Sequence, residues 1–427
     1  MEKKFRKMNL EERLEALRSR VALTEAEVSA IKNPFAVTKF EDLNRMIENA
    51  IGMYPIPLGI ATNFLINGKK YLIPMATEEP SVIAAASYAA KLAGMNGGFR
   101  SKMNKSIMRG QIQVVSVKNI QIVQDNISEN KEDLLRTANA NARTIKAIDI
   151  KTKVLDDLND KSFNFSDPML VVEVMIDTKN AMGANAVNSM CELLAPKIER
   201  ITQGKVILKI LSNYATERIA TCDTTIRKRD LGGNKTVDRM LHGFAFAYLD
   251  PYRAVTHNKG IMNGIDAVAL ATGQDFRAIE AAAHAYASRD GKYRPLSTFY
   301  KDTNGDLACK IELPLAVGTV GGIASVYPMA KIGLKTLQVS SAQELGMVIV
   351  AVGLAQNIAA LRALADEGIQ KGHMKLHSRN IAIAAGATGL LIDLVAKRMS
   401  NQSNITIENA RRIIEGARKG TQKSQLR

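Results

Sequence analysis

Apolar and small residues recur at helical spacing in several long stretches of the chain, and each stretch predicts a packed helix. Three such stretches are residues 80–96, 264–288 and 341–368. In the first, the fixed φ and missing N–H of Pro80 suit the first helical position, and the pair Gly97-Gly98 marks the end. The first thirty residues also have a helical pattern, in which Thr24 and Glu27 have the spacing of a capping box.

The composition changes near residue 106, and up to residue 212 strand-like stretches are separated by two helical ones; residues 110–124 alternate between apolar and polar positions. We expect strands at residues 110–124, 169–178 and 205–213, and helices at residues 130–148 and 183–203. Outside this region, residues 69–75 follow the Asn67-Gly68 turn and predict a further strand. The order of strands and helices suits a small α+β unit with a ferredoxin-like split pattern.

These patterns divide the 427-residue chain into four segments and predict an α+β fold. We expect a large, mainly helical domain built from residues 1–105 and 213–371. It is interrupted by the small ferredoxin-like domain, residues 106–212. Glycines 368 and 372 flank a hinge, and beyond it residues 372–427 are expected to form a C-terminal helical flap.

The formal net charge of +16 leaves two classes of partner open. A basic surface can attract nucleic acid, or a polyanionic small molecule such as coenzyme A or a dinucleotide. The chain has no tryptophan and only 5% aromatic residues, and no nucleic-acid-binding motif accompanies its lysines and arginines. We therefore expect no nucleic-acid partner.

Cysteine usage and hydropathy indicate where the protein works. Cys191, Cys222 and Cys309 lie far apart, which argues against a disulfide framework or a structural zinc site and suits a reducing cytoplasm. The N-terminus is charged throughout and lacks the apolar core of a signal peptide. The most apolar later runs, residues 345–355 and 381–392, are shorter than the roughly twenty residues that span a bilayer. We expect a soluble cytoplasmic protein without a membrane partner.

Glu78 and Glu79 stand directly before the helix that Pro80 is expected to open. Acids at a helix start complement the helix dipole, and this is the simpler interpretation. The alternative is that neighbouring charge and burial raise the pKa of one acid, which would make it a proton donor. The local sequence leaves both interpretations open.

Three other stretches combine polar groups that could act on a ligand. Residues 178–188 join a strand to a helix through Gly183 and several asparagines, and the N–H groups of the helix start would suit a phosphate. The stretch lacks the GxGxxG fingerprint, so an ordinary strand-to-helix turn is an equal alternative. Residues 252–276 carry several charged and amide side chains. Singly these would be solvated, but together they could shift one another's pKa values.

The third stretch contains His373 and His377, four residues apart. Such a pair can hold a metal ion from one face of a helix, but no third ligand accompanies it. We expect no metal, and an exposed histidine that acts as an acid or base beside the glycine hinge.

Seven of these stretches follow the order in which they occur in the 3-hydroxy-3-methylglutaryl-coenzyme A (HMG-CoA) reductase family, and the chain resembles this family over essentially its whole length. They are ENAIGMYPIPLGIA from Glu48, EEPSVIAAAS from Glu78, NAMGANAVN from Asn180, NKGIMNGIDAV from Asn258, ATGQD from Ala271, GTVGGI from Gly318 and GHMKLH from Gly372. The short N-terminus is similar to the soluble bacterial and archaeal branch. The resemblance implies that two reduced nicotinamides convert HMG-CoA to mevalonate and free CoA, through mevaldyl-CoA and mevaldehyde.

The resemblance also implies roles for individual residues. The family's catalytic glutamate, lysine, aspartate and histidine match Glu79, Lys259, Asp275 and His373. Positions that hold the hydroxymethylglutaryl moiety match Ser81, Arg253 and Asn263. The family's cofactor loop matches Asn180, Met182, Gly183, Asn185 and Asn188. On this interpretation the large domain binds the substrate, the small domain binds the cofactor, and Asp275 lies beside Lys259 and orients it.

Many relatives carry an aspartate where this chain has Asn180. At this position of the cofactor loop the chain therefore departs from the family's pattern. Either NADPH or NADH could serve, and Arg143 and Lys146, with no acid before Asp149, favour NADPH. The resemblance places the active site between subunits, with ENAIG near the neighbour's site. A homodimer is then the minimum assembly, and a hexamer is the alternative.

Two questions stay open at this level. The enzyme could run towards mevalonate or towards its breakdown. The competing interpretation is a basic, non-enzymatic binding protein that retains the fold.

Overall fold

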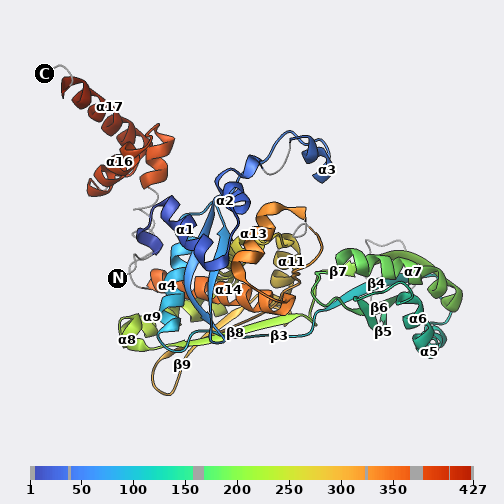
Figure 1. The fold of residues 1–427 in the computed structure, drawn as a ribbon. Helices are drawn as coiled ribbons and strands as arrows, with labels where there is room; N and C mark the ends of the chain where they lie inside the picture. Colours follow the sequence, from blue (N-terminus) through green and yellow to red (C-terminus); the bar gives the residue numbers. More distant parts are fainter. Residues whose placement is uncertain are drawn as a thin grey trace.

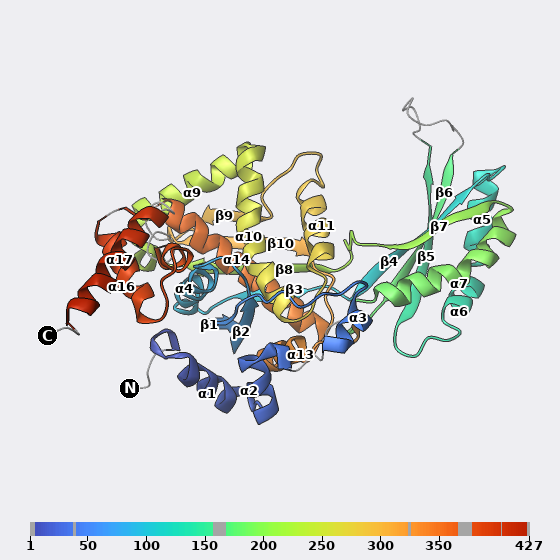
Figure 2. The same cartoon turned by 90° about the horizontal axis from the view of Figure 1, so that it is seen from above.

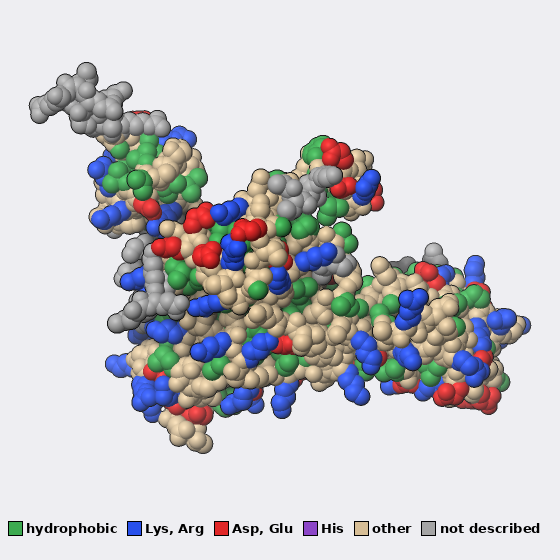
Figure 3. Space-filling view, in the orientation of Figure 1, with side chains coloured by type: hydrophobic (Ala, Val, Ile, Leu, Met, Phe, Trp, Pro, Cys, Tyr) green, Lys and Arg blue, Asp and Glu red, His purple; other side chains and the backbone are tan. Residues whose placement is uncertain are grey.

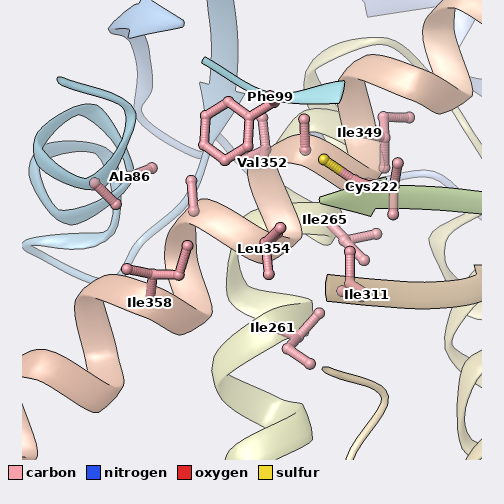
Figure 4. Close-up of a cluster of buried hydrophobic side chains, with 14 of the residues drawn as sticks. Ala86, Phe99, Cys222, Ile261, Ile265, Ile311, Ile349, Val352, Leu354 and Ile358 are labelled. Carbon is pink, nitrogen blue, oxygen red and sulfur yellow. The ribbon is translucent and has the colours of Figure 1, made fainter. Parts of the chain in front are cut away.

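The longest helix that the structure describes, α14 (Ala342–Ala365), runs through the middle of the larger hydrophobic core (Figure 1). The structure is a computed structural model, which describes residues 5–36, 40–156, 168–322, 326–365, 378–402 and 404–424. Helix α14 packs against α4 (Val82–Gly94), α9 (Asn234–Leu249), α10 (Pro251–Ala271) and three strands. Figure 4 shows its apolar side chains meeting those of α10 and of the neighbouring sheet.

Two glycines let α10 and α14 approach closely. A Cβ added at Gly264 of α10 would lie 2.9 Å from the Cβ of Gln356 and 3.0 Å from the carbonyl oxygen of Val352. A Cβ added at Gly353 of α14 would lie 2.9 Å from the side chain of Ile265. Because neither position has room for a side chain, these small residues set the distance between α10 and α14. The helix predicted over residues 264–288 is divided: α10 starts earlier, at Pro251, and α11 follows as a separate helix.

A four-stranded sheet covers one side of this helical core. Its strand order is β3-β8-β10-β9, with antiparallel pairing throughout. The strands are β3 (Arg100–Met103), β8 (Ile219–Ile226), β9 (Ser297–Lys301) and β10 (Leu307–Pro314). The short helix α8 (Lys228–Leu231) follows β8, and α11 (Phe276–Ala287) packs beside β10.

A β-hairpin leads into α4. Strand β1 (Leu58–Ile66) pairs with β2 (Lys69–Ala76), and the turn residues Asn67 and Gly68 both have positive φ, as the sequence indicated. The helix α4 begins at Val82, two residues after Pro80, and ends at Gly94, before the Gly97-Gly98 pair. Both ends therefore differ from the prediction. The helix starts later because Ser81 takes the left-handed conformation and delays the first helical turn.

The small unit is an antiparallel sheet with the order β5-β6-β4-β7, which is the split pattern that the sequence predicted. Its elements are β4 (Ile107–Val115), α5 (Ile120–Glu129), α6 (Lys131–Ala138), β5 (Lys146–Leu155), β6 (Met169–Asp177), α7 (Ala184–Thr202) and β7 (Lys205–Ser212). Two assignments were wrong: residues 120–124 are helical rather than extended, and residues 146–148 begin a strand rather than end a helix. The three helices bury one face of the sheet in a core of their own.

The N-terminal helices pack outside the large domain. Helices α1 (Leu10–Val21) and α2 (Glu25–Lys32) form an apolar cluster with α13 (Pro328–Leu337), and the predicted capping box of Thr24 and Glu27 begins α2. Short helical turns η1 (Phe5–Lys7), η2 (Pro34–Ala36), η3 (Phe40–Asp42) and α3 (Leu43–Met46) flank them. An irregular arm connects α3 to β1, and Figure 1 shows α3 standing away from the large domain.

The last two helices, α16 (Leu390–Asn401) and α17 (Ile407–Ser424), have their own small apolar cluster. In both views they lie at the opposite end of the large domain from the small sheet (Figures 1 and 2). The predicted domain boundaries at residues 105, 212 and 371 stay predictions.

One helix of the described residues, α14, is long and apolar enough to cross a membrane, although the sequence had suggested that this run was too short. Its most apolar window is 72% buried inside the protein. The helix is therefore the centre of a protein core, where continuous apolar character is expected.

A buried polar network fixes the first half of α10. His257 Nε2 lies 2.7 Å from Ser297 Oγ, which donates a 2.7 Å hydrogen bond to Asn357 Oδ1 of α14. Asn258 donates to the carbonyl oxygen of Arg294 and accepts from the N–H of Leu296. Hydrogen bonds to α14 and to residues 294–297 therefore hold α10 in place immediately before Lys259.

Replacing Gly264 by alanine should force α10 away from α14 and lower the free energy of unfolding by about 1–3 kcal/mol. Gly260→Ala is the matched control in the same helix, because its added Cβ would meet nothing nearer than 3.9 Å. That change should leave the melting temperature unchanged or raise it, since alanine has the higher helix propensity. Equal melting temperatures for the two variants would contradict the close approach.

Burial, with a smaller contribution from Arg253, lowers the pKa of His257 from 6.5 to about 4. Between these two values the unfolded chain binds a proton that the native protein excludes, so acidification favours unfolding. The stability advantage of the native protein over His257→Gln should therefore shrink by up to about 3 kcal/mol as pH falls from about 6.5 to about 4. Urea unfolding of both proteins across this range measures the difference, and a constant difference would contradict a neutral buried imidazole.

Candidate active site

Glu79 occupies a turn between β2 and α4, next to a residue in an unusual conformation. Ser81 is not glycine but has φ +79°, and it precedes α4 without a side-chain capping bond. Strain of this kind gathers at functional sites. Glu78 is exposed, whereas the side chain of Glu79 is 36% exposed and faces α10. The two adjacent acids therefore have different surroundings.

Two side chains of α10 converge on one carboxylate oxygen of Glu79. Lys259 Nζ donates to Glu79 Oε2 at 2.8 Å, and Asn263 Nδ2 donates to the same oxygen at 3.2 Å. Residues four apart on a helix lie on the same face, so one stripe of α10 presents both donors. The sequence-based interpretation grouped these three residues, and the structure brings them together.

Arg253 lies in the first turn of α10, where Asp250 caps the helix by accepting from the N–H of Arg253. Its side chain is half-buried, and burial lowers the pKa of the guanidinium from its ordinary value. The guanidinium has no hydrogen-bond partner among the residues that the structure describes. A half-buried cation of this kind can receive a carboxylate.

Within one chain, Asp275 lies beyond the end of α10, whereas Lys259 lies in its interior, so the predicted pairing of the two residues stays a prediction. Continuous helix separates Lys259 from Ala271, a distance of about 18 Å along the axis at ~1.5 Å per residue, and Asp275 follows four residues later. Asp275 Oδ1 instead accepts from the N–H of Ala278 and pairs with Arg277 at 3.2 Å. The two ends of α10 therefore carry two separate groups of predicted site residues.

The loop after β6 contacts the large domain beside Asp275. The backbone oxygen of Asn180 accepts from the N–H of Thr319 at 2.8 Å, and its side chain accepts from the N–H of Ala342 at the start of α14. Gly318, in turn, donates its N–H to Gln274 Oε1 at 2.8 Å. Sequence reasoning missed Gln274, which nothing but its position before Asp275 marks in the sequence.

The start of α7 carries the predicted cofactor loop and has no side-chain cap. Gly183 precedes the helix with φ +97°, no side chain caps the first turn, and a Cβ there would lie 2.3 Å from Thr178 Cγ2. The first N–H groups are thus open to an anion. Met182 is half-buried and Asn185 is exposed, whereas Asn188 accepts from the N–H of Leu211 and ties α7 to β7.

Arg143 is exposed in the loop before β5. Strand β5 begins at Lys146, which pairs with Asp177, the last residue of β6 before the loop. Arg143, which was predicted to bind the nucleotide, therefore lies at the same end of the β5–β6 strand pair as Asn180. Asp149, the next acid, is already paired with Lys131, which holds the pKa of its carboxyl below the usual value.

A cleft of about 1370 Å³ opens beside Glu79 and Ser81. It runs between the N-terminal helices and the β1–β2 hairpin, and basic side chains line it. These are Arg6, Arg13, Arg20, Lys70 and Lys91. Figure 3 shows lysine and arginine side chains distributed over the visible face of the large domain.

Two further predictions concern the histidine pair and metal binding. His373 and His377 lie outside the described residues. Among the residues that the structure does describe, no group of three or more His, Cys, Asp or Glu side chains could hold a metal ion.

Comparison with known proteins identifies the family. The family model for hydroxymethylglutaryl-coenzyme A reductase matches residues 9–378. The chain is 48% identical to the 3-hydroxy-3-methylglutaryl-coenzyme A reductase of Archaeoglobus fulgidus over 97% of this chain and 94% of that protein. It is 37% identical to a probable reductase of Borreliella burgdorferi, over 89% of this chain and 86% of the relative.

Solved structures agree. A class II 3-hydroxy-3-methylglutaryl-CoA reductase from Streptococcus pneumoniae, bound to NADPH in open conformations, is 37% identical, with a TM-score of 0.78 over 96% of this chain and 100% of that one. The chain therefore belongs to the HMG-CoA reductase family, whose members are NAD(P)-dependent oxidoreductases.

Proposed function

We propose that Glu79, Lys259 and Asn263 form the catalytic centre at which HMG-CoA is reduced to mevalonate and free CoA. The observation that carries this assignment is the convergence of Lys259 and Asn263 on one carboxylate oxygen beside a strained Ser81. The nicotinamide supplies the hydride in each of two steps. The protein must then stabilise charge on the carbonyl oxygen and deliver a proton to it.

Lys259 is suited to the first task. Its ammonium group is paired with Glu79, which lines the cleft, and 59% of its side chain is exposed, so it can turn from Glu79 to a substrate oxygen. A cation held there stabilises the developing oxyanion without reorganisation of water. Glu79 accepts hydrogen bonds from both donors, which places it beside the substrate oxygen; in its protonated form it would supply the proton to that oxygen.

Substrate orientation follows from the neighbouring groups. Arg253 offers a half-buried guanidinium, without a partner in the described part of the chain, for the free carboxylate of the hydroxymethylglutaryl group. Ser81 and Asn263 offer hydrogen bonds nearer the reacting carbon. The basic cleft beside Glu79 is large enough to hold the CoA chain and to pair with its phosphates. His373, which lies outside the described residues, would protonate the departing thiolate.

Asp275 then acts from a second subunit. One chain supplies Glu79 from the turn before α4, with Lys259 and Asn263 from the middle of α10. The other chain supplies Asp275 with its adjoining cofactor loop. The separation of about 18 Å along α10 supports this division. The arm between α3 and β1 also supports it, because Ile51 is 95% and Tyr54 91% exposed. Apolar side chains this exposed would be covered in a homodimer.

The nucleotide would bind at the start of α7, with its phosphates on the open N–H groups after Gly183. Arg143, at the same edge of the sheet, would pair with the 2′-phosphate and favour NADPH over NADH. Cys191, Cys222 and Cys309 are free and buried, which suits the reducing cytoplasm in which the protein would work. A hexamer would require further contacts between dimers.

The direct test is loss of nicotinamide absorbance when the purified protein meets HMG-CoA with NADPH, and separately with NADH. Turnover with either nucleotide establishes the activity, and the ratio of the two rates gives the preference. A basic binding protein that retained the fold would bind CoA but oxidise neither nucleotide.

Lys259→Ala should slow both HMG-CoA and mevaldehyde reduction by at least about a hundredfold, because charge develops on an oxygen in both steps. Lys70→Ala is a control that removes a lysine from the same cleft without touching Glu79; it should affect the Michaelis constant for HMG-CoA and spare mevaldehyde reduction. Near-normal mevaldehyde reduction by Lys259→Ala would contradict the role of the lysine.

A further inference from the structure

Arg218 is completely buried where the chain passes from the small sheet to the large one. It follows β7 and immediately precedes β8, and it is the largest side chain among the fully buried residues that the structure describes. A buried cation is costly unless polar groups surround it. The groups that surround Arg218 therefore indicate what it does.

Its guanidinium binds the loop that leads into α7. Nη1 donates to Thr178 Oγ1 at 3.2 Å and to the carbonyl oxygens of Ala181 and Met182 at 3.3 and 3.2 Å. Nη2 donates to the carbonyl oxygen of Val317, after β10. One rigid, planar group thus joins three acceptors of the loop to one acceptor of the large domain.

A second contact joins the same loop to the large domain. A Cβ added at Gly318 would lie only 2.5 Å from the backbone nitrogen of Met182, so the two backbones are in direct contact. Gly318 is held from its other side by Gln274, the residue before Asp275. Through these contacts the loop has a fixed position relative to Asp275.

We propose that Arg218 is a positioning residue for the nicotinamide nucleotide. It holds residues 178–183 in the conformation that presents the start of α7 to the phosphates, at a set distance from Asp275. This inference rests on the proposed function, because it takes that loop as the nucleotide site. Burial lowers the pKa of Arg218 to about 10, so the group stays charged at neutral pH.

Arg218→Lys keeps the charge but cannot reach four acceptors with one planar group. In this variant NADPH should bind about tenfold more weakly or worse, measured by titration of nucleotide fluorescence without substrate. The Michaelis constant for NADPH should rise in parallel. That for HMG-CoA should change less than about twofold, because the groups assigned to the substrate lie on α10 and in the turn before α4.

Arg227→Lys is the matched control for loss of a structural arginine. Arg227 lies just after the other end of β8, where it binds Asp230 and the carbonyl oxygen of Met95. Its replacement should lower the melting temperature and leave the dissociation constant for NADPH unchanged.

Gly318→Ala tests the same loop without removing a buried charge, and it decides the matter if Arg218→Lys does not fold. Its added Cβ should displace Met182 and weaken NADPH binding selectively. Gly416→Ala, where an added Cβ meets nothing within 4 Å, should bind NADPH normally.

Selective loss of nucleotide binding in Arg218→Lys or Gly318→Ala supports the inference. Unchanged NADPH binding in a folded variant, or equal loss for NADPH and HMG-CoA, overturns it and leaves Arg218 a structural residue. If the native protein binds NADPH but does not oxidise it with HMG-CoA, the proposed function fails while the inference about the loop stands. If the native protein binds no nucleotide, both fail.

Discussion

The close approach of α10 to α14 determines where the chemistry of this protein can take place. Gly264 and Gly353 remove the side chains that would separate the two helices, and the apolar residues around them fill the core. The buried hydrogen bonds of His257 and Asn258 fix the rotation of α10 about its own axis. With both distance and rotation set, Lys259 and Asn263 face Glu79.

The same rigid helix keeps the two halves of the catalytic machinery apart. Lys259 is at its middle and Asp275 lies beyond its end, so no adjustment of side chains can bring them together in one chain. Asp275 is joined instead to the loop before α7 through Gln274 and Gly318. The proposed pairing of subunits would bring nucleotide and Asp275 as one preassembled unit to the substrate of the neighbour. Catalysis would then depend on assembly as well as on folding.

Much of this could be predicted from the sequence, because the relevant signals are local. The Asn67-Gly68 turn, the capping box at Thr24 and the apolar, β-branched residues of β6 and β7 each follow from neighbouring residues. The stretch after β4 could not be assigned in this way: apolar residues continue past Val115, but Asn119 caps a helix there. Pro80 was a reasonable helix start, and only the left-handed Ser81 displaced it.

The site residues show a similar division. Motif order identified Glu79, Lys259 and Asn263, and the structure places them in contact. Spacing along the chain could not show that Asp275 and Lys259 lie at different ends of a straight helix. The sequence also could not identify Arg218, because an arginine before a strand has no distinguishing pattern. Its role is indicated only by the four hydrogen-bond acceptors that surround it in the folded protein.

The central claim is that two subunits complete each active site, and mixing inactive variants tests it most directly. In hybrids of Lys259→Ala with Asp275→Ala, one of the two sites would contain both native residues. Randomly reassociated dimers should therefore recover about a quarter of native activity. Hybrids of Lys259→Ala with Glu79→Gln, whose changes fall in the same half-site, should stay inactive. Absence of recovery in the first mixture, with hybrid dimers demonstrated by native mass spectrometry, would contradict the account.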